Sequence, residues 1–302
     1  MATDIVLALG AVLLWSTVAT AFKLGLEVFD PLQLLTLAVT IATAFFLIIA
    51  FATGRLDGRA AGTAHGLGPI IDGPGARRAA LLGLLNPLAY YLVLFAAYDR
   101  LPAQIAQPLN YTWSITLALL AVPLLRQPLG AARLLGIGIS YCGVLIILAP
   151  WSASFAALSW LGIALALGST LIWASYWLLD ARTTSDPIVT MCIGFATACP
   201  LLIGACYLTS GWPELTPRGL AIAGWVGLCE MGIAFLLWQA ALRRTKRAAL
   251  LGQLIFLSPF LSLGLIHSVL GEGVKLTTVL GLVVIVAGLA WNAREPQPRT
   301  SL

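Results

Sequence analysis

Charged residues are scarce in this sequence: Asp, Glu, Lys and Arg together make up 10% of its 302 positions. An ordinary soluble domain carries about 25%. Hydrophobic residues account for 60% of the chain, which is more apolar surface than a soluble core of this length could hide. The composition therefore excludes an ordinary soluble protein and predicts an integral membrane protein in a lipid bilayer.

Motifs of common enzymes and metal sites are also missing. The chain contains no P-loop GxxxxGK[ST], no GxSxG and no HExxH segment, so we expect no ATPase activity from this chain alone. The only two histidines, His65 and His267, are far apart, and the five cysteines form no CxxC pair. We therefore expect no metal site and no cofactor. The 12 acidic residues are scattered, which disfavours a membrane-embedded enzyme, and we expect no catalytic residues.

Ten apolar segments are long enough to cross a bilayer, which takes roughly 20 residues each. They are 4–22, 31–53, 79–98, 103–125, 131–149, 158–179, 187–209, 218–239, 248–268 and 275–293. Turn-forming pairs such as Asp30-Pro31 and Asp186-Pro187 separate them. The leading residues MATD contain no Lys or Arg, so we read the first segment as a retained helix and not as a signal peptide.

The positive charges lie mostly on one side of these ten segments. If the sides alternate, 13 of the 17 Lys and Arg residues share the side of the N-terminus. The positive-inside rule makes that side cytoplasmic. We therefore expect a multi-pass protein of a bacterial-type inner membrane with both termini in the cytoplasm. The net charge of +5 follows from these loops, so no nucleic-acid partner is expected.

The two halves of the chain correspond when the sequence is shifted by 145 residues. The segment LLRQPLGAARLLGIGISYCG (124–143) then lies over VLGEGVKLTTVLGLVVIVAG (269–288). Each half holds five spans, and an odd number inserts the second half upside down. Many secondary transporters are such inverted repeats, with the substrate site at their interface. We predict an all-α fold of ten transmembrane helices, as two inverted five-helix repeats (1–150 and 151–302) around a central cavity.

The segment QPLNYTWSI, which begins at Gln107, places polar groups in an otherwise apolar run. On a helix Gln107, Asn110, Tyr111 and Ser114 share one face, because they are spaced three and four apart. Polar residues gathered on one face of a membrane helix usually point into the bundle. Pro108 removes one backbone hydrogen bond and is expected to bend the helix. This face is therefore predicted to line a water-accessible cavity.

Aromatic residues in other spans form the second part of the predicted site. The candidates are Trp15, Tyr90, Tyr91, Trp113, Trp173 and Trp177. Their rings could stack on an aromatic substrate, each pair contributing about 0.5–1.5 kcal/mol. Any one of them could also fill a gap between helices. For the group as a whole we expect substrate binding.

Three polar residues of the second half complete the candidate site. Glu230 lies in the middle of a span, where a carboxylate is costly unless it is paired, protonated or facing a cavity. It either meets a substrate ammonium or a proton, or is a neutral acid bonded to nearby backbone. Gln253 and Ser258 are expected on the wall opposite the polar segment. Pro259 is expected to act with Pro108 as a bending point.

Both halves end in the pattern (E/Q)-x-(L/V) followed by two glycines seven apart, here Gln127, Gly136 and Gly143, and Glu272, Gly281 and Gly288. With its five-plus-five helices and this pattern, the chain resembles the drug/metabolite transporter superfamily over nearly its whole length. Gln127 stands where an acid is common in the family. The segment NYTWS (110–114) resembles the fourth helix of YddG-type aromatic amino acid exporters.

The resemblance implies export of aromatic and other neutral amino acids by alternating access, with amino acids as the small-molecule partners. An alternative is the same fold exporting lipophilic cations or other small metabolites, because aromatic boxes also hold cations and Glu230 would supply a counter-charge. Ten spans can enclose a cavity without a second chain, so we expect a monomer.

Overall fold

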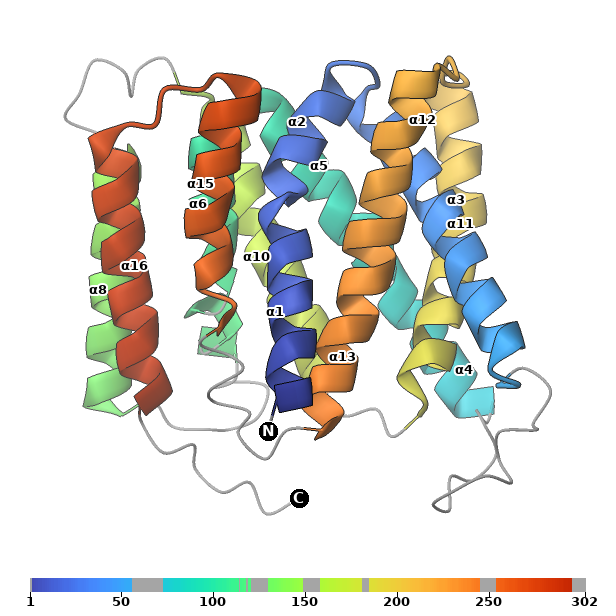
Figure 1. Ribbon diagram of the computed structural model, residues 1–302, viewed down its shortest axis with the longest axis horizontal. Helices are drawn as coiled ribbons and strands as arrows, with labels where there is room; N and C mark the ends of the chain where they lie inside the picture. Colours follow the sequence, from blue (N-terminus) through green and yellow to red (C-terminus); the bar gives the residue numbers. More distant parts are fainter. Residues whose placement is uncertain are drawn as a thin grey trace.

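The computed structural model of the chain describes residues 2–55, 73–113, 115–117, 119–120, 130–148, 158–180, 185–244 and 254–294. Within these residues every regular element is a helix, and no strand is present. The helices stand side by side along one common direction (Figure 1). Helices satisfy their backbone hydrogen bonds internally, which is what the bilayer interior demands.

Several spans consist of two or three consecutive elements separated by a break or a change of helix type. In chain order the elements are α1 (Ala2–Ser16), α2 (Val18–Leu26), α3 (Pro31–Ala52), α4 (Gly73–Gly83), η2 (Leu84–Ala89), α5 (Tyr90–Arg100), α6 (Ala103–Tyr111), α8 (Ala131–Leu148), α10 (Trp160–Asp180), α11 (Pro187–Thr209), α12 (Pro217–Gly224), η3 (Trp225–Ala234), α13 (Phe235–Arg244), α15 (Leu257–Leu270) and α16 (Leu276–Arg294). The elements η2 and η3 are π-helical.

Six helices of the described residues are long and apolar enough to cross a membrane. They are Thr3–Leu26, Pro31–Ala52, Gly73–Arg100, Trp160–Asp180, Pro187–Thr209 and Pro217–Ala241. Three shorter apolar helices accompany them: Leu134–Leu148, Leu257–Leu270 and Leu276–Trp291. All nine fall within segments predicted from the sequence or extend them by a few residues. Within the predicted segment 103–125 the structure describes α6 and a few further helical residues. Residues 121–129 lie outside the described part.

One boundary differs clearly from its prediction. The helix expected at 79–98 begins at Gly73 and thus includes Arg77 and Arg78. Pro74 is tolerated at such a start, because the first turn has no intrahelical partner for its missing N–H. The Arg78 Nη2 donates to the Leu179 carbonyl at 2.7 Å, which anchors this extra turn to the end of α10.

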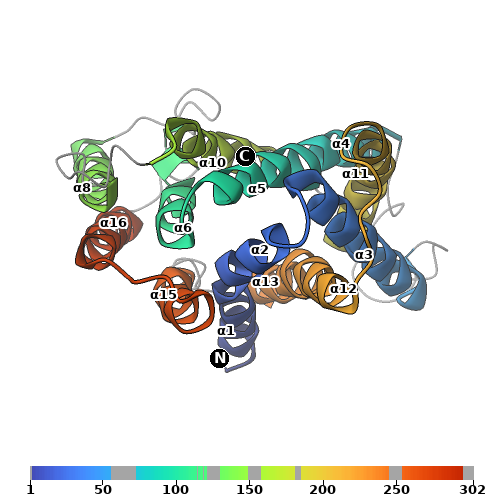
Figure 2. The same ribbon diagram turned by 90° about the horizontal axis from the view of Figure 1, so that it is seen from above.

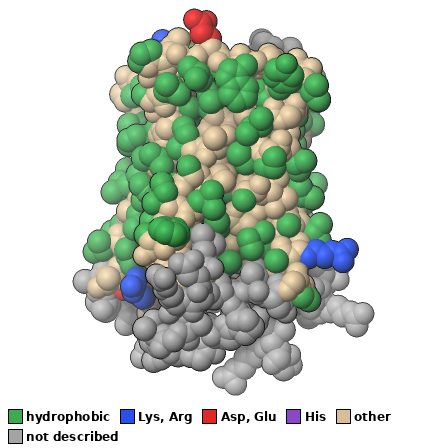
Figure 3. Space-filling view, turned by 90° about the vertical axis from the view of Figure 1, so that its right-hand side faces the viewer, with side chains coloured by type: hydrophobic (Ala, Val, Ile, Leu, Met, Phe, Trp, Pro, Cys, Tyr) green, Lys and Arg blue, Asp and Glu red, His purple; other side chains and the backbone are tan. Residues whose placement is uncertain are grey.

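The outer wall of the bundle is hydrophobic, and charged side chains gather at its two ends (Figure 3). Exposed residues of the wall include Ile48 and Phe51, with 65% and 69% of their surfaces accessible. Exposed apolar side chains of this extent are what a helix facing lipid presents. Together with the apolar helix lengths, this wall makes the chain a multi-pass membrane protein.

Helices α3 and α11 pack side by side in opposite directions, and both begin with the same cap. The Oδ1 of Asp30 accepts from the Leu32 and Gln33 N–H groups, both at 2.8 Å. The Oδ1 of Asp186 accepts from the Ile188 N–H at 2.8 Å. In each case a proline follows at the first helical position, as the sequence pairs Asp-Pro predict. An ion pair of 3.1 Å between Asp186 and Arg55 joins the start of α11 to the end of α3.

Helices α8 and α16 also pack in opposite directions, and glycines bring them close. A Cβ added at Gly143 would meet the backbone of Gly281, and one at Gly288 would meet the backbone of Gly136. The Ser140 hydroxyl donates across the contact to the Ile285 carbonyl at 3.2 Å. Small residues let membrane helices approach to backbone contact. The two glycine pairs that end the halves thus bring α8 and α16 into backbone contact.

The remaining elements surround the middle of the molecule. Seen from above, α1, α2, α5, α6, α10, α13 and α15 lie around a central region, with the α8 and α16 pair on one side and α3, α4, α11 and α12 on the other (Figure 2). The side chains that these central elements turn inward form the candidate site.

Candidate functional site

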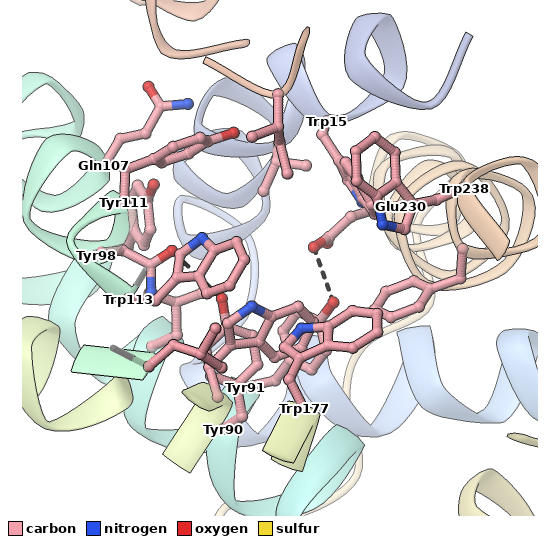
Figure 4. Close-up of a pocket in the computed structure, with 17 residues that line it drawn as sticks. Trp15, Tyr90, Tyr91, Tyr98, Gln107, Tyr111, Trp113, Trp177, Glu230 and Trp238 are labelled. Carbon is pink, nitrogen blue, oxygen red and sulfur yellow. Dashed lines mark hydrogen bonds between the residues drawn. The ribbon is translucent and has the colours of Figure 1, made fainter. Parts of the chain in front are cut away.

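A cavity of about 260 Å³ lies among the central helices. Aromatic and aliphatic side chains form most of its wall, with a few polar groups between them (Figure 4). The lining residues are Trp15, Val18, Tyr90, Tyr91, Leu94, Tyr98, Gln107, Asn110, Tyr111, Trp113, Leu117, Trp173, Trp177, Glu230, Phe235, Trp238 and Ile255. A mostly apolar pocket with a few convergent polar groups is the usual form of a small-molecule site.

A break in the first span positions Trp15. The hydroxyls of Ser16 and Thr17 donate back to the carbonyls of Leu13 and Leu14 at 2.6 and 2.7 Å. Such bonds compete with the helix ladder and bend helices, and α1 ends here. The Trp15 ring lies 5.4 Å from the Trp238 ring and forms the side of the cavity facing α13.

A kink in the third span positions two tyrosines. Asn86 has extended backbone angles (φ −142°, ψ 115°) inside η2, as favoured for a residue before proline. Helix α5 restarts at Tyr90, and both Tyr90 and Tyr91 are buried against the cavity. The Tyr90 ring stacks on Trp173 with centroids 4.3 Å apart.

The polar segment of α6 faces the cavity through Gln107, Asn110 and Tyr111. Asn110 Nδ2 donates to the Ser169 hydroxyl at 3.0 Å, and its Oδ1 accepts from the Tyr90 hydroxyl at 3.3 Å. These bonds fix the amide between two helices of opposite halves. Tyr111 donates its hydroxyl to Ser258 Oγ on α15 at 2.7 Å.

A continuous aromatic wall runs along α10. The Trp173 ring contacts Trp113 at 6.5 Å and Trp177 at 5.7 Å, both edge to face. Phe235 closes the row on the far side, 5.8 Å from Trp173. Edge-to-face geometry is favourable for such pairs. Trp173 is thus the centre of the wall.

Glu230 faces this wall from η3, where two glycines press the helix against α3. A Cβ at Gly227 would meet the carbonyl of Ala38, and one at Gly232 would meet the ring of Phe45. Glu230 lies between them in sequence and points the other way, into the cavity (Figure 4). Only 7% of its surface is accessible. π-Helical segments are frequent at functional sites.

The carboxylate of Glu230 is only partly satisfied. The Tyr91 hydroxyl donates to its Oε1 at 2.8 Å. Its other oxygen, Oε2, has no hydrogen-bond partner among the described residues, and the same is true of Gln107 Oε1 and Trp177 Nε1. Each such buried polar atom costs about 1–3 kcal/mol. All three atoms belong to residues that line the cavity, and each atom is itself buried.

The structure brings together ten of the twelve residues expected to bind substrate, all of them lining the cavity. Ser258 supports Tyr111 from behind without lining the cavity itself. Gln253 lies outside the described residues, as do Ser114 and Gln127. Pro108 lies inside α6, one residue after Gln107, and Pro259 lies in the first turn of α15.

Several lining residues were not among the candidates. Tyr98 is seven residues after Tyr91, so the spacing of one helix face could have revealed it. Phe235 follows Glu230 by five residues. Trp238, near the inner mouth of its span, is a weaker candidate from the sequence, and the structure places it in the cavity wall along α13.

Three comparisons place this chain among known proteins. The model of the EamA-like transporter family matches residues 3–149 and 160–294. No curated protein sequence matches significantly. A solved structure titled only "Crystal structure of protein" superposes with a TM-score of 0.64, covering 96% of this chain and 98% of its own, at 22% identity. At that identity the structural likeness speaks for the fold alone.

Proposed function

This chain belongs to the EamA-like transporter family, and we propose that it exports aromatic and other neutral amino acids across a bacterial-type inner membrane. Membership of the family means small-molecule transport across a membrane and no enzymatic role. The proposal rests on one observation. Among the described residues that line the cavity, aromatic side chains surround one carboxylate, that of Glu230, which can meet a substrate ammonium.

The size and the wall of the cavity favour a small aromatic ligand. Its volume of about 260 Å³ lies just below the range of roughly 300–1,000 Å³ that holds drug-sized ligands. A single amino acid suits this space better than a large drug. The ring of the substrate would pack against Trp173 and Tyr90, and its ammonium would approach Glu230 Oε2.

Transport would proceed by alternating access of two inverted repeats, 1–150 and 151–302. Helices at equivalent places of the two halves run in opposite directions, α3 against α11 and α8 against α16, which supports an inverted relation. Residues from both halves line the cavity. The bends at Pro108 and Pro259 would serve as hinges between states.

The orientation and assembly follow from the same sequence arguments. The excess of Lys and Arg on the side of the N-terminus would place both termini in the cytoplasm. One copy encloses a cavity with its own helices, so the transporter would work as a monomer.

Uptake and counterflow in proteoliposomes would test the function. The panel is labelled Phe, Trp, Tyr, Met, Thr, Lys and Glu, with and without a pH gradient. Saturable movement of the aromatic and neutral members is expected. No amino acid movement by intact protein would refute the proposal.

Two cavity substitutions connect the test to the site. Tyr111→Ala and Trp113→Ala should each reduce transport while expression is unchanged, since both side chains line the cavity. Trp212→Ala is the matched control, because that ring is 55% exposed and is absent from the lining residues described. Unchanged transport in both cavity variants would remove these residues from the site.

A further inference from the structure

The cavity carries a charge of one sign only. Among the described residues that line it, Glu230 is the one with an ionisable carboxylate, and none is Lys, Arg or His. A neutral amino acid brings both an ammonium and a carboxylate. The ammonium has a partner in Glu230, whereas the substrate carboxylate has no cation to meet within the described wall.

The covalent structure of an amino acid worsens this mismatch. Its ammonium and carboxylate are attached to the same carbon atom, so an ammonium on Glu230 Oε2 holds the substrate carboxylate close to that of Glu230. Two like charges at such a distance repel each other strongly where water is excluded. Trp177, which lines the cavity, has an Nε1 donor without a partner among the described residues. That group is a buried, neutral N–H and could offset this repulsion only in part.

The hydrogen-bonding groups of the cavity also select the kind of cation. Glu230 Oε2 is an acceptor, and its partner oxygen already receives the Tyr91 hydroxyl at 2.8 Å. Gln107 lies across the cavity from Glu230 (Figure 4), and its Oε1 is a second buried acceptor without a hydrogen-bond partner among the described residues. A cation that donates N–H bonds satisfies such an oxygen, whereas a quaternary ammonium does not.

We propose that primary arylalkylamines are substrates of this cavity, recognised by their ammonium at Glu230 and their ring at Trp173 and Tyr90. The carboxylate of an amino acid is then no part of the recognition. This inference rests on the proposed function, because it uses the same cavity and the same aromatic wall. It adds a substrate class and predicts the order in which related compounds bind.

Calorimetric titration of the full chain in detergent tests the inference with five compounds that share one ring. They are phenylalanine, phenylalanine amide, 2-phenylethylamine, 3-phenylpropionate and trimethyl(2-phenylethyl)ammonium. The primary amine and the amide should bind at least about tenfold tighter than phenylalanine, because the repulsion is removed. The trimethyl compound should bind more weakly than the primary amine, and 3-phenylpropionate should not bind.

The outcomes separate the inference from the proposed function. Binding of phenylalanine without binding of 2-phenylethylamine overturns the inference and leaves the function standing. Binding of 3-phenylpropionate as tight as that of the amine also overturns it. If neither phenylalanine nor the amine binds, both proposals fail.

Substitution of Glu230 tests whether its carboxylate causes the predicted order of binding. Glu230→Gln should abolish the preference for the amine over phenylalanine. Glu27→Gln is the matched control, since that carboxylate is 55% exposed and pairs with Arg218 outside the lining set described. A preserved preference in Glu230→Gln would overturn the inference. The compound series on the unaltered chain stands as a test even if this variant is unstable.

Discussion

Glu230 and Glu272 are both glutamates, but their surroundings differ. Glu272 lies between α15 and α16, and both its oxygens accept from backbone, from the Ala103 N–H at 3.0 Å and the Gln104 N–H at 3.3 Å. These N–H groups form the first turn of α6, where donors have no intrahelical partner and negative charge is favoured. Glu230 lies deep in the bundle, with a bond to Tyr91 on one oxygen.

The difference shows how to separate a structural carboxylate from a functional one. Glu272 is tied further by Gln104, whose Nε2 donates to the Gly273 carbonyl at 3.0 Å and whose Oε1 accepts from the Lys275 N–H at 3.1 Å. Its environment is complete and joins α6 of the first half to the second half. Glu230 lines the cavity, and its Oε2 has no hydrogen-bond partner among the described residues. We therefore assign a structural role to Glu272 and propose ligand binding for Glu230.

The largest effect is expected for Glu230→Gln. The amide keeps the shape and the bond with Tyr91 but removes the charge offered to a substrate ammonium. Affinity for phenylalanine should fall about 10- to 100-fold, as for loss of a hydrogen bond to a charged group. The melting temperature should stay equal or rise, because a neutral amide is less costly to bury than a carboxylate. Calorimetry measures the affinity and thermal unfolding the melting temperature. Unchanged affinity would show that Glu230 does not bind the substrate.

Tyr91→Phe sharpens the contrast with Glu272, because it removes the hydroxyl that donates to Glu230. The free energy of unfolding should fall by about 1–3 kcal/mol, the cost of leaving a buried polar group unpaired. Combining it with Glu230→Gln should cost less than the sum of the single changes, since the residues are in contact. Strict additivity in thermal unfolding would show that the charge of Glu230 adds nothing to the stabilisation by the 2.8 Å bond.

Glu272→Ala should have the opposite profile to Glu230→Gln. Loss of the carboxylate at the start of α6 should lower the free energy of unfolding by about 0.5–2 kcal/mol, as for a lost helix cap. Affinity for phenylalanine should stay within about twofold, or about 0.4 kcal/mol, because Glu272 is not among the described residues that line the cavity. A large loss of affinity with unaltered stability would contradict the assignment of Glu272 as structural.

The smallest effect is expected for Ser258→Ala. This change frees the Tyr111 hydroxyl from its 2.7 Å bond without touching the cavity wall. One neutral hydrogen bond contributes about 0.5–1.5 kcal/mol, and we expect most of that to appear in stability. Transport should fall less than in Tyr111→Ala. Equal losses in the two variants would mean that Ser258 itself contacts the substrate.

Much of the fold could be predicted from local sequence signals. The apolar segments predicted the helices, and the Asp-Pro pairs predicted the breaks that precede α3 and α11. The spacing of Gln107, Asn110 and Tyr111 predicted one face, which the structure turns to the cavity. Each of these signals acts within a few residues along the chain.

The parts that escaped prediction depend on distant residues. Tyr91 and Glu230 are 139 positions apart and Glu272 is 169 positions from Ala103, and no periodicity marks either contact. The π-helix at Trp225–Ala234 depends on how closely Gly227 and Gly232 pack on α3. Only packing in three dimensions determines these features.

Counterflow of labelled phenylalanine into proteoliposomes, run in parallel for the unaltered chain and for Glu230→Gln, is the most direct test of transport through the cavity at Glu230. The unaltered chain should exchange phenylalanine saturably above protein-free liposomes, and Glu230→Gln should lower the exchange at least about tenfold at subsaturating substrate. Equal exchange by the two proteins would contradict the role of Glu230, and no exchange by either would contradict amino acid transport itself.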